Sequence, residues 1–504
     1  MKRNNTSKRF LLRGVLSMIL SLLMIAGAIP GGWAVMTAHA DPAPEKTITG
    51  LGTGAISGPV VPASKDSEWS GSYVYYGSYN SQPVKYRVLA PSTNIFGGNT
   101  MFLDCDATLF DHEFRNDYGA EDANQWSVSD VRTKLNNAED ADSFLNKGFN
   151  AVERAAIAES TIAEHELANF VTGKAREWLG RTHEGDDKKY YTPLDRDKIF
   201  LLDVEDILNT AYGYSSDCGF DVVGQVWHAV NSHKKSGSSS YWWLRSPSSA
   251  YRYCAGYVDS AGEVRVRQVN NSIGVSPAFN INLSFVIFSS LILGTAGVAG
   301  AEYKLTLKDS NLTIAAGAKR DTDDTSKYHI SYDITDNSTI STPTQVSVVV
   351  TDGTWSTDSG WIGATKFQYT KLDVDSWNTS GTGSFTLDSS ITGEWGTAFH
   401  VYVLAEDVNG EKETDYASAP LELKLPSYGL KFDANDGTGL MASMNVCDND
   451  MFTFPACDFT APTGKTFDYW DMTGKVDEKF YSGDNTICTN LSLICDGWYV
   501  TIYP

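Results

Sequence analysis

Short alternating runs of apolar residues, separated by turn-forming residues, are the feature that most restricts the folds open to this chain. Between residues 302 and 426 no segment has the periodicity of an amphipathic helix, and Asp, Asn, Gly, Ser and Thr fill the gaps between the runs. The runs lie at 303–307, 312–315, 329–334, 345–350, 399–404 and 421–425. Because closely spaced strands with polar turns are typical of two packed antiparallel sheets, we predict an immunoglobulin-like β-sandwich over residues 302–426.

Residues 67–295 mix two patterns. Strand-like segments come first and return later, at 73–79, 84–89, 101–104, 241–244, 256–258, 263–269 and 278–283. Between them, Ser129 precedes Val131 and Leu135 with helical spacing, and residues 151–180 carry Ala, Ile and Leu among many charges. This order predicts an α+β domain, with strands at both sequence ends and helices between them.

The first forty residues have the three parts of a secretory signal. Basic residues open the chain, an apolar run follows at 15–29, and Ala38-His39-Ala40 supplies a small-x-small site. We therefore predict cleavage between Ala40 and Asp41, followed by a flexible leader over residues 41–66, which are rich in Pro, Gly, Ser and Thr. The alternative is an uncleaved membrane anchor.

A second apolar stretch covers residues 283–301 and is long enough to cross a bilayer. It contains Ser, Thr and Gly, and no basic cluster flanks either end to set an orientation. We predict a buried strand running into a Gly- and Ala-rich linker rather than a transmembrane span.

Charge excludes two classes of partner. The chain has 62 acidic and 40 basic residues, for a formal net charge of −22. Five of the basic residues lie in the predicted signal, which has no acid, so its removal would change the charge from −22 to −27. A chain this acidic lacks the basic surface that nucleic acids and anionic lipids require.

The cysteines fall into two groups. The last 78 residues hold Cys447, Cys457, Cys488 and Cys495. In an exported chain this number predicts two disulfides, with three possible pairings, while a zinc site is the alternative. The spacings lack the short C-x₂₋₄-C clips of such a site. The first domain has Cys105, Cys218 and Cys254, which leaves one thiol unpaired, either buried or exposed and reactive.

Motifs of catalysis are missing from the sequence. It contains no HExxH, no GxSxG, no phosphate-binding loop and no dinucleotide fingerprint. Asp104, Asp106 and Asp111 place carboxylates close together after a strand, so they are candidate ligands for calcium or decorations of an acidic loop. We expect no enzymatic activity and no cofactor apart from this calcium candidate.

The segment Tyr241-Trp242-Trp243-Leu244-Arg245-Ser246-Pro247 is the most specific local feature. Adjacent residues of a strand point to opposite faces, so one indole can enter the core while the other reaches a ligand. Trp242, Trp243 and Arg245 are therefore candidate ligand-binding residues. The alternative is a core strand that carries an ion-paired arginine.

Six blocks in the first domain resemble a domain of uncharacterised function found in secreted Gram-positive bacterial proteins. They lie at 73–89, 101–106, 126–136, 197–206, 241–247 and 274–283, and include the WWLRSP motif and a closing GVSPA where that family has GVRPA. The resemblance covers residues 67–295 and departs at Ser276, where the family usually has Arg. It implies a fold similar to C-type lectins and to formylglycine-generating enzymes, although no active-site cysteine pair of those enzymes maps onto this chain.

The last module, residues 427–504, resembles the Listeria–Bacteroides repeat, also called the internalin B-repeat. Residues 429–439, 459–470 and the Gly483-Asp484 pair carry this resemblance. It implies a small β-grasp-like module with Phe432, Phe467 and Trp470 in its core. The Asp436-Gly437 pair is the predicted hairpin turn.

Export, acidity and spacer-like β modules together favour a secreted, cell-surface or cell-wall-associated protein. We expect its first domain to bind a glycan or a protein of a host or neighbouring cell, with the β modules as a stalk. The alternatives are an extracellular enzyme acting on polymers and a purely structural surface protein. We expect no nucleic-acid partner and no transmembrane span in the mature chain; the sequence leaves the oligomeric state open.

Overall fold

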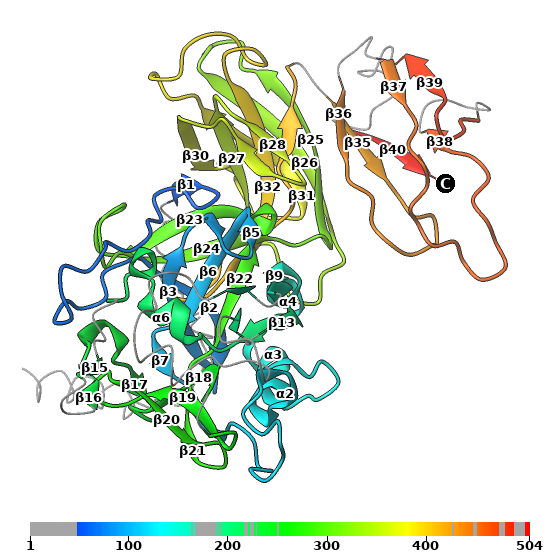
Figure 1. Ribbon diagram of the computed structural model, residues 1–504. Helices are drawn as coiled ribbons and strands as arrows, with labels where there is room; N and C mark the ends of the chain where they lie inside the picture. Colours follow the sequence, from blue (N-terminus) through cyan, green and yellow to red (C-terminus); the bar gives the residue numbers. More distant parts are fainter. Residues whose placement is uncertain are drawn as a thin grey trace, which may run out of the picture. The chain divides into compact units, whose positions relative to one another are not determined.

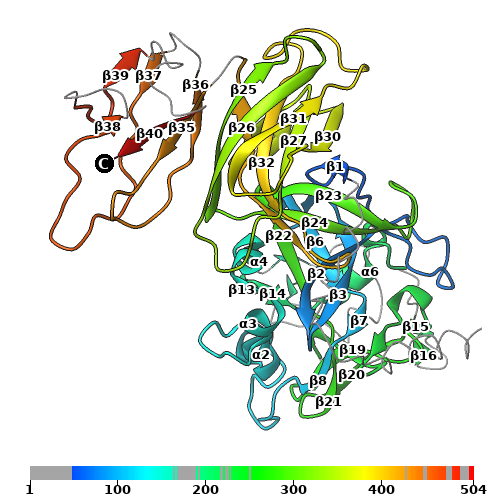
Figure 2. The same cartoon turned by 180° about the vertical axis from the view of Figure 1, so that it is seen from behind.

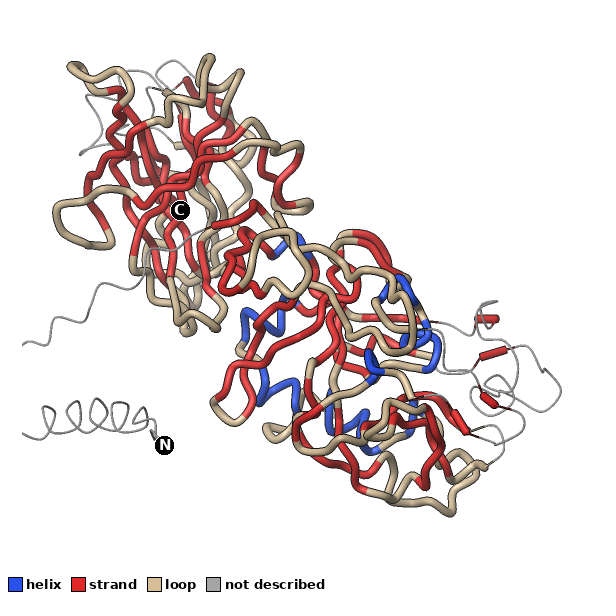
Figure 3. Tube along the Cα trace, turned by 90° about the vertical axis from the view of Figure 1, so that its left-hand side faces the viewer, coloured by secondary structure: helices blue, strands red, loops and turns tan. Residues whose placement is uncertain are grey.

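The computed structural model describes residues 48–162, 165–166, 189–190, 193–215, 220–221, 226–227, 229–248, 251–425, 428–446, 451–472, 479–487 and 499–503. All of them belong to one compact unit that spans residues 46–504. The predicted signal and its cleavage site at Ala40 and Asp41 lie outside the described residues, so both stay predictions. Figure 3 shows strands distributed throughout the described residues, whereas helices form a few short stretches there.

One large sheet organises the molecule. Its ten-strand path has the order β14-β22-β6-β3-β2-β24-β33-β32-β27-β30, and β1, β9, β23 and β34 attach to it (Figure 1). The path strands are β14 (Ile199–Phe200), β22 (Ala278–Asn282), β6 (Thr100–Cys105), β3 (Gln82–Ala90), β2 (Tyr73–Tyr79), β24 (Glu302–Lys308), β33 (Asp415–Ala417), β32 (His400–Asp407), β27 (Gln345–Thr351) and β30 (Phe367–Lys371).

This sheet crosses the boundary that the sequence suggests between residues 295 and 302. Strand β24 lies between β2 of the first domain and β33 of the sandwich, and it runs parallel to both. Figure 2 shows β24 beside β23, between the sandwich strands and β2. Its apolar side chains Tyr303, Leu305 and Leu307 belong to the core of the first domain. The sequence predicts that this strand begins the sandwich; in the structure it joins the strands of the first domain to those of the sandwich in one sheet.

The leader also differs from expectation. Residues Ile48–Leu51 form strand β1, which pairs antiparallel with β23 (Val286–Leu293). Ile48 and Ile56 are buried in two different core clusters. Two isolated isoleucines among Gly, Pro and Thr give no periodicity, which is why this part of the leader reads as flexible from sequence.

The first domain contains a second sheet and few helical residues. The second sheet has the order β20-β19-β18-β21-β8, with β20 (Val264–Gln268), β19 (Cys254–Val258), β18 (Trp242–Pro247), β21 (Ser272–Val275) and β8 (Phe110–Glu113). Among the described residues of the first domain, the α-helices have five to seven residues each. They are α2 (Asp130–Asn136), α3 (Phe144–Gly148), α4 (Ala151–Ala156) and α6 (Val204–Leu208). Among its described residues the first domain is therefore rich in strands and has short helices, and residues 167–188 of the expected helical section lie outside the described residues.

Shorter elements complete the first domain. They are the 3-10 helices η1 (Trp126–Val128), η2 (Thr210–Tyr212), η3 (Asn231–His233) and η4 (Leu283–Phe285), with the paired strands β4 (Thr93–Asn94) and β5 (Gly97–Gly98), β7 (Ala107–Thr108) and β17 (Ser236–Gly237), β10 (Ser160–Ile162) and β13 (Leu194–Asp197), β11 (His165–Glu166) and β12 (Lys189–Tyr190), β15 (Phe220–Asp221) and β16 (Val226–Trp227), and β9 (Ile157–Ala158) against β22.

Residues 283–301 contain the predicted strand, preceded by the single turn of 3-10 helix η4. Strand β23 occupies Val286–Leu293, and a turn region follows it before β24 begins. Among the helices of the described residues, none is long and apolar enough to cross a membrane.

The sandwich packs a second sheet against the end of the large one. This second sheet has the order β25-β26-β31, formed by β25 (Leu312–Arg320), β26 (Lys327–Asp336) and β31 (Ser380–Thr386), while β34 (Leu421–Leu423) pairs with β32 and β28 (Thr354–Ser356) pairs with β29 (Gly360–Ile362). Val346, Val348 and Val350 of β27 enter the sandwich core, whereas Val349 packs with Ile287 from β23. Both faces of β27 are therefore buried, which joins the sandwich to the first domain through a second apolar cluster.

The last module has its own core. Strands β36 (Met444–Val446), β35 (Tyr428–Phe432), β40 (Tyr499–Tyr503) and β38 (Asp471–Met472) form one sheet, and β37 (Met451–Thr453) pairs with β39 (Asn485–Ile487). Phe432, Phe467 and Trp470 pack together as predicted, with ring centroids 5.4 and 5.0 Å from Trp470. The predicted turn is displaced by one residue, because Asn435 and Asp436 have the positive φ angles and Gly437 N donates to Ala434 O.

Candidate functional site

The two tryptophans of strand β18 are core residues. Both indoles have no exposed surface, although they point to opposite faces of the strand. Trp242 donates from Nε1 to the carbonyl of His233 at 3.2 Å, and Trp243 donates to the carbonyl of His112 at 2.9 Å. With both rings buried and hydrogen-bonded inside the protein, neither can meet an external ligand, and the ligand-binding role predicted for them is wrong. The reason is that β18 is covered on both of its faces.

Arg245, the third predicted ligand contact, is also fully buried. Its guanidinium contacts Asp203 Oδ2 at 2.5 Å and Asp206 Oδ2 at 2.9 Å, and it donates to the carbonyl of Leu201 at 2.6 Å. Asp203 is the N-cap of α6, and the two aspartates form a reciprocal capping box at the start of that helix. Arg245 therefore fastens β18 to α6, and its charge is used within the core.

Asp206 gives this cluster a pH dependence. Burial, with the negative charge of Asp203 adding to it and Arg245 opposing it, raises the pKa of Asp206 to about 7. An unfolded aspartate titrates near ~3.9, so between these values the folded protein binds more protons than the unfolded chain. The contribution of Asp206 to the free energy of unfolding is thus complete below pH ~4 and falls as the pH rises to ~7.

We expect Asp206→Asn to flatten the dependence of stability on pH in that window. The difference between variant and wild type should change by at least about 1 kcal/mol between pH ~4 and ~7. Urea unfolding of both proteins at the two ends of the window measures it. Parallel pH profiles for the two proteins would contradict the raised pKa.

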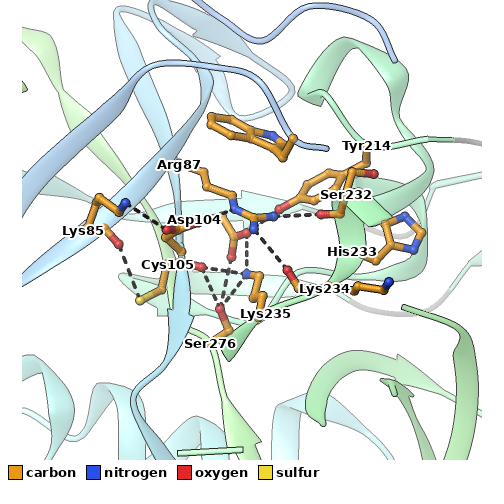
Figure 4. A network of polar contacts seen from close by, with 12 residues as sticks. Lys85, Arg87, Asp104, Cys105, Tyr214, Ser232, His233, Lys234, Lys235 and Ser276 are labelled. Atoms are coloured by element: carbon orange, nitrogen blue, oxygen red, sulfur yellow. Dashed lines mark hydrogen bonds and ion pairs between the residues drawn. The ribbon is translucent and has the colours of Figure 1, made fainter. Parts of the chain in front are cut away.

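A second buried cluster surrounds Asp104 on strand β6 (Figure 4). Lys235 Nζ lies 2.6 Å from Asp104 Oδ2 and 2.7 Å from Ser276 Oγ, and it donates to the carbonyl of Cys105 at 2.8 Å. The hydroxyl of Tyr214 donates a short hydrogen bond to the same Oδ2. We call Asp104, Lys235, Ser276 and Tyr214 the Asp104 cluster; all four residues are buried, and the side chains of Asp104 and Lys235 have no exposed surface.

Burial sets the chemistry of this cluster. Desolvation lowers the pKa of Lys235, the charge of Arg87 acts in the same direction, and Asp104 opposes both. Desolvation also raises the pKa of Tyr214 well above its usual value, and Asp104 adds to this, so the phenol stays protonated. A serine hydroxyl beside a lysine amine can act as a nucleophile in an open site, but here no substrate can reach it.

Arg87 and Asp106 form a neighbouring pair. Arg87 Nε donates to Asp106 Oδ1 at 2.8 Å, and its other nitrogens donate to the carbonyls of Ser232 and Lys234 at 2.8 and 3.2 Å. Lys85 Nζ lies 3.3 Å from Asp106 Oδ2. Burial alone would raise the pKa of Asp106, but the two cations lower it overall.

The predicted calcium ligands are not arranged as a cation site. Lys235 neutralises Asp104, Arg87 and Lys85 neutralise Asp106, and the carboxylate of Asp111 accepts a hydrogen bond from Ser238 at 2.7 Å. Within the part of the chain that the structure describes, no group of three or more His, Cys, Asp or Glu residues is placed to hold a metal ion. The three carboxylates are therefore taken up by lysine, arginine and serine partners within the protein and are not gathered around a shared cation position.

Ser276 is the position at which this sequence has Ser where the resembled family usually has Arg. Its hydroxyl lies against Lys235 Nζ, so the cation beside Asp104 comes from residue 235, which follows η3, rather than from residue 276.

The cysteines that the structure describes are unpaired. Cys105 and Cys254 are buried thiols, and desolvation raises their pKa to about 12 and about 11. Cys457 is a half-buried free thiol packed against the core of the last module, so the predicted disulfide is not formed at this residue. Cys218, Cys447, Cys488 and Cys495 lie outside the described residues, where the predicted pairing remains a prediction.

An open cleft of about 890 Å³ lies where the first domain meets the sandwich. Its lining is mostly amide, hydroxyl and charged, and includes Ser78, Asn146, Lys147, Thr339, Asn409 and Glu413. The lining residues come from β2, β3, α3 and α4 on one side, and from β33 and loops of the sandwich on the other. Both parts of the protein therefore build it.

Glu153 of α4 forms the floor of this cleft and is 5% exposed. Its Oε1 accepts from Thr414 Oγ1 at 2.8 Å and from Tyr416 OH at 3.3 Å, and its Oε2 accepts from Asn150 N at 3.0 Å. Burial raises the pKa of Glu153, and these hydrogen bonds oppose the rise. Lys304 Nζ, 2.8 Å from Asp415 Oδ1, adds a buried ion pair to the same junction. The two walls of the cleft are thus held in place by polar contacts.

Sequence reasoning missed both the Asp104 cluster and the cleft. Asp104 and Lys235 are 131 positions apart, and nothing in their local sequence marks them as partners. Asn150-x-x-Glu153 does carry the signature of a capping box, which the structure contains and which could have located α4.

Comparison with known proteins gives one family. A family model described as Domain of unknown function (DUF6273) matches residues 98–283, less than half of the chain. The matched segment runs from just before β6 to the end of β22, and so contains β18; it leaves β2, β3 and β24 outside. No curated protein and no solved structure matches the chain.

Proposed function

We propose that this protein is an exported surface protein that binds a carbohydrate polymer of a host or neighbouring cell in the cleft between its first domain and its sandwich. The cleft is the observation that carries the proposal. Amide and hydroxyl side chains are suited to exchange hydrogen bonds with sugar hydroxyls, and about 890 Å³ accommodates a short oligosaccharide. The buried clusters around Arg245 and Asp104 offer no comparable access.

The same junction supports a display role for the β modules. A sheet that continues from the first domain into the sandwich fixes the two walls of the cleft relative to each other. A preorganised site loses less conformational freedom on binding than a flexible one. The sandwich, for which we propose an immunoglobulin-like fold, and the β-grasp-like last module then serve as the spacer. The first domain itself is proposed to be C-type-lectin-like.

The test is binding of the full mature chain to a glycan array, followed by a variant that fills the cleft. Ser78 is exposed at the cleft and makes no side-chain hydrogen bond that anchors the fold, so Ser78→Trp should obstruct the site and weaken binding at least about 10-fold. Ser92→Trp is the matched control, because Ser92 is an exposed serine of the first domain outside the cleft, and it should bind as wild type does.

Two outcomes would overturn the proposal, and two others would point to one of the alternatives. The first is no glycan bound by the wild-type chain, and the second is equal binding by Ser78→Trp and wild type. Release of sugars from a bound glycan would instead favour the extracellular-enzyme alternative. Binding to a protein but to no glycan would show that the partner is a protein, which is the other class of partner that the sequence left open.

A further inference from the structure

The Asp104 cluster places an amine against a carboxyl group in a site without water access. Lys235 Nζ and Asp104 Oδ2 are 2.6 Å apart, and both side chains have no exposed surface. The distance from Nζ to the carboxyl carbon Cγ therefore exceeds the Nζ–Oδ2 distance by at most one C–O bond length. This places the two atoms close to the roughly 3–3.5 Å of a near-attack contact. Residues 131 positions apart are held in this geometry by β6 and by the loop after η3.

From this geometry we propose that Lys235 and Asp104 condense to an intramolecular amide cross-link. The Nζ–Cγ bond forms and the Cγ–Oδ2 bond breaks. The ammonium and the carboxylate together supply everything the reaction needs: two protons leave the nitrogen, Oδ2 takes both, and it departs as water. The amide nitrogen keeps one hydrogen, the two charges cancel, and no oxidant, reductant or activating group takes part.

Tyr214 and Ser276 have positioning roles in this step. The Tyr214 hydroxyl donates to Oδ2, the oxygen that leaves, and so can stabilise the charge that develops there and relay a proton. Ser276 Oγ lies 2.7 Å from Nζ and 3.4 Å from Asp104 Oδ1. By contacting both groups, it holds the amine next to the carboxyl group. The ring of Trp242, 4.3 Å from Nζ, closes the site on another side.

Burial supplies the driving force. Two ions in a water-free core carry a desolvation penalty of several kcal/mol each, which a neutral amide removes. Burial also favours the uncharged amine that must attack, and the lowered pKa of Lys235 agrees with this. Effective molarities of about 10⁵–10⁸ M for well-oriented groups offset the cost of amide formation in water.

Peptide mapping of the full mature chain tests the cross-link. The protein is denatured, reduced, digested with trypsin and analysed by tandem mass spectrometry. We expect one branched species that joins the peptides of Asp104 and Lys235, lighter than their sum by one water, with no cleavage after Lys235. Recovery of the two peptides as separate linear species, with normal cleavage after Lys235, would overturn the proposal.

An internal control and two variants sharpen this result. Lys147 and Asp142 have the same 2.6 Å separation, but their side chains are 54% and 69% exposed, so they should remain unlinked. Lys235→Arg keeps the positive charge and should abolish the branched species. Tyr214→Phe should slow its formation at least about 10-fold in freshly synthesised protein. A link at Lys147–Asp142 as abundant as that at Lys235–Asp104 would show that burial and Tyr214 play no part, and would overturn the mechanism.

Discussion

Replacing Arg245 by methionine is expected to lower the free energy of unfolding of the first domain by about 3–5 kcal/mol. The substitution leaves two carboxylates, Asp203 and Asp206, in the core without the guanidinium that lies 2.5 and 2.9 Å from them. Removal of one partner from a buried ion pair is far more damaging than loss of an exposed pair, because the remaining charge stays desolvated. Urea denaturation measures the change in the free energy of unfolding. Hydrogen exchange at the amides of β18 and α6 in the native protein shows whether the loss of stability is centred there.

A matched variant separates this effect from loss of charge in general. Arg265 also contacts two acids, Asp259 and Glu263, but its side chain is 45% exposed, so Arg265→Met should cost at most about 1 kcal/mol. Adding Asp203→Asn and Asp206→Asn to Arg245→Met should restore part of the lost stability, because the uncompensated charges are then gone. If Arg245 met a ligand instead, Arg245→Met would weaken binding and leave stability unchanged.

The second large effect is expected at Trp470 in the last module. Trp470 is fully buried, and Phe432, Phe459 and Phe467 surround it. Its Nε1 also donates to the carbonyl of Pro455 at 2.9 Å. Trp470→Ala removes the largest side chain of a small core and should cost about 3–5 kcal/mol, enough to unfold a module of this size.

The unfolding should stay local, because the core of the last module is a cluster separate from that of the sandwich. Hydrogen exchange measured by mass spectrometry should therefore show lost protection from residue 428 onward and unchanged protection in the first domain. Tyr481→Ala is the control, since this side chain of the same module is 49% exposed. A loss of protection throughout the chain in Trp470→Ala would mean that the modules fold as a single cooperative unit.

The strands were predictable because their alternation is local. Strands β25, β26, β27 and β32 carry apolar residues at every second position, and this pattern gave their places in the sequence. The partners of a strand are not a local property. Strand β24 reads as the opening strand of a sandwich, yet it pairs with β2, more than two hundred residues earlier in the chain.

The candidate site was less predictable for a related reason. All six residues of β18 are buried, including Arg245, so the strand lies inside the protein on both faces. A strand that is buried on both faces lacks the alternation of apolar and polar residues, and the run W-W-L-R-S-P lacks it. Arg245 hides this pattern in the sequence, because a charged residue suggests exposure to solvent. Nor could the sequence show the cleft, since its walls come from four segments that only the fold brings together.

The position of β24 has a consequence for the order in which this chain can acquire its structure. A ribosome releases β2 long before β24 and β33 exist, and β1 must wait equally long for β23, with which Ile48 pairs at Ser290. Until then the nascent first domain has an open strand edge beside an unfinished apolar core, the kind of surface that recruits other chains. Contacts of such sequence separation also make folding slow. A fragment cut between residues 295 and 302 would retain that open edge permanently, so we expect a fragment that ends after β34 to aggregate less than one that ends after β23.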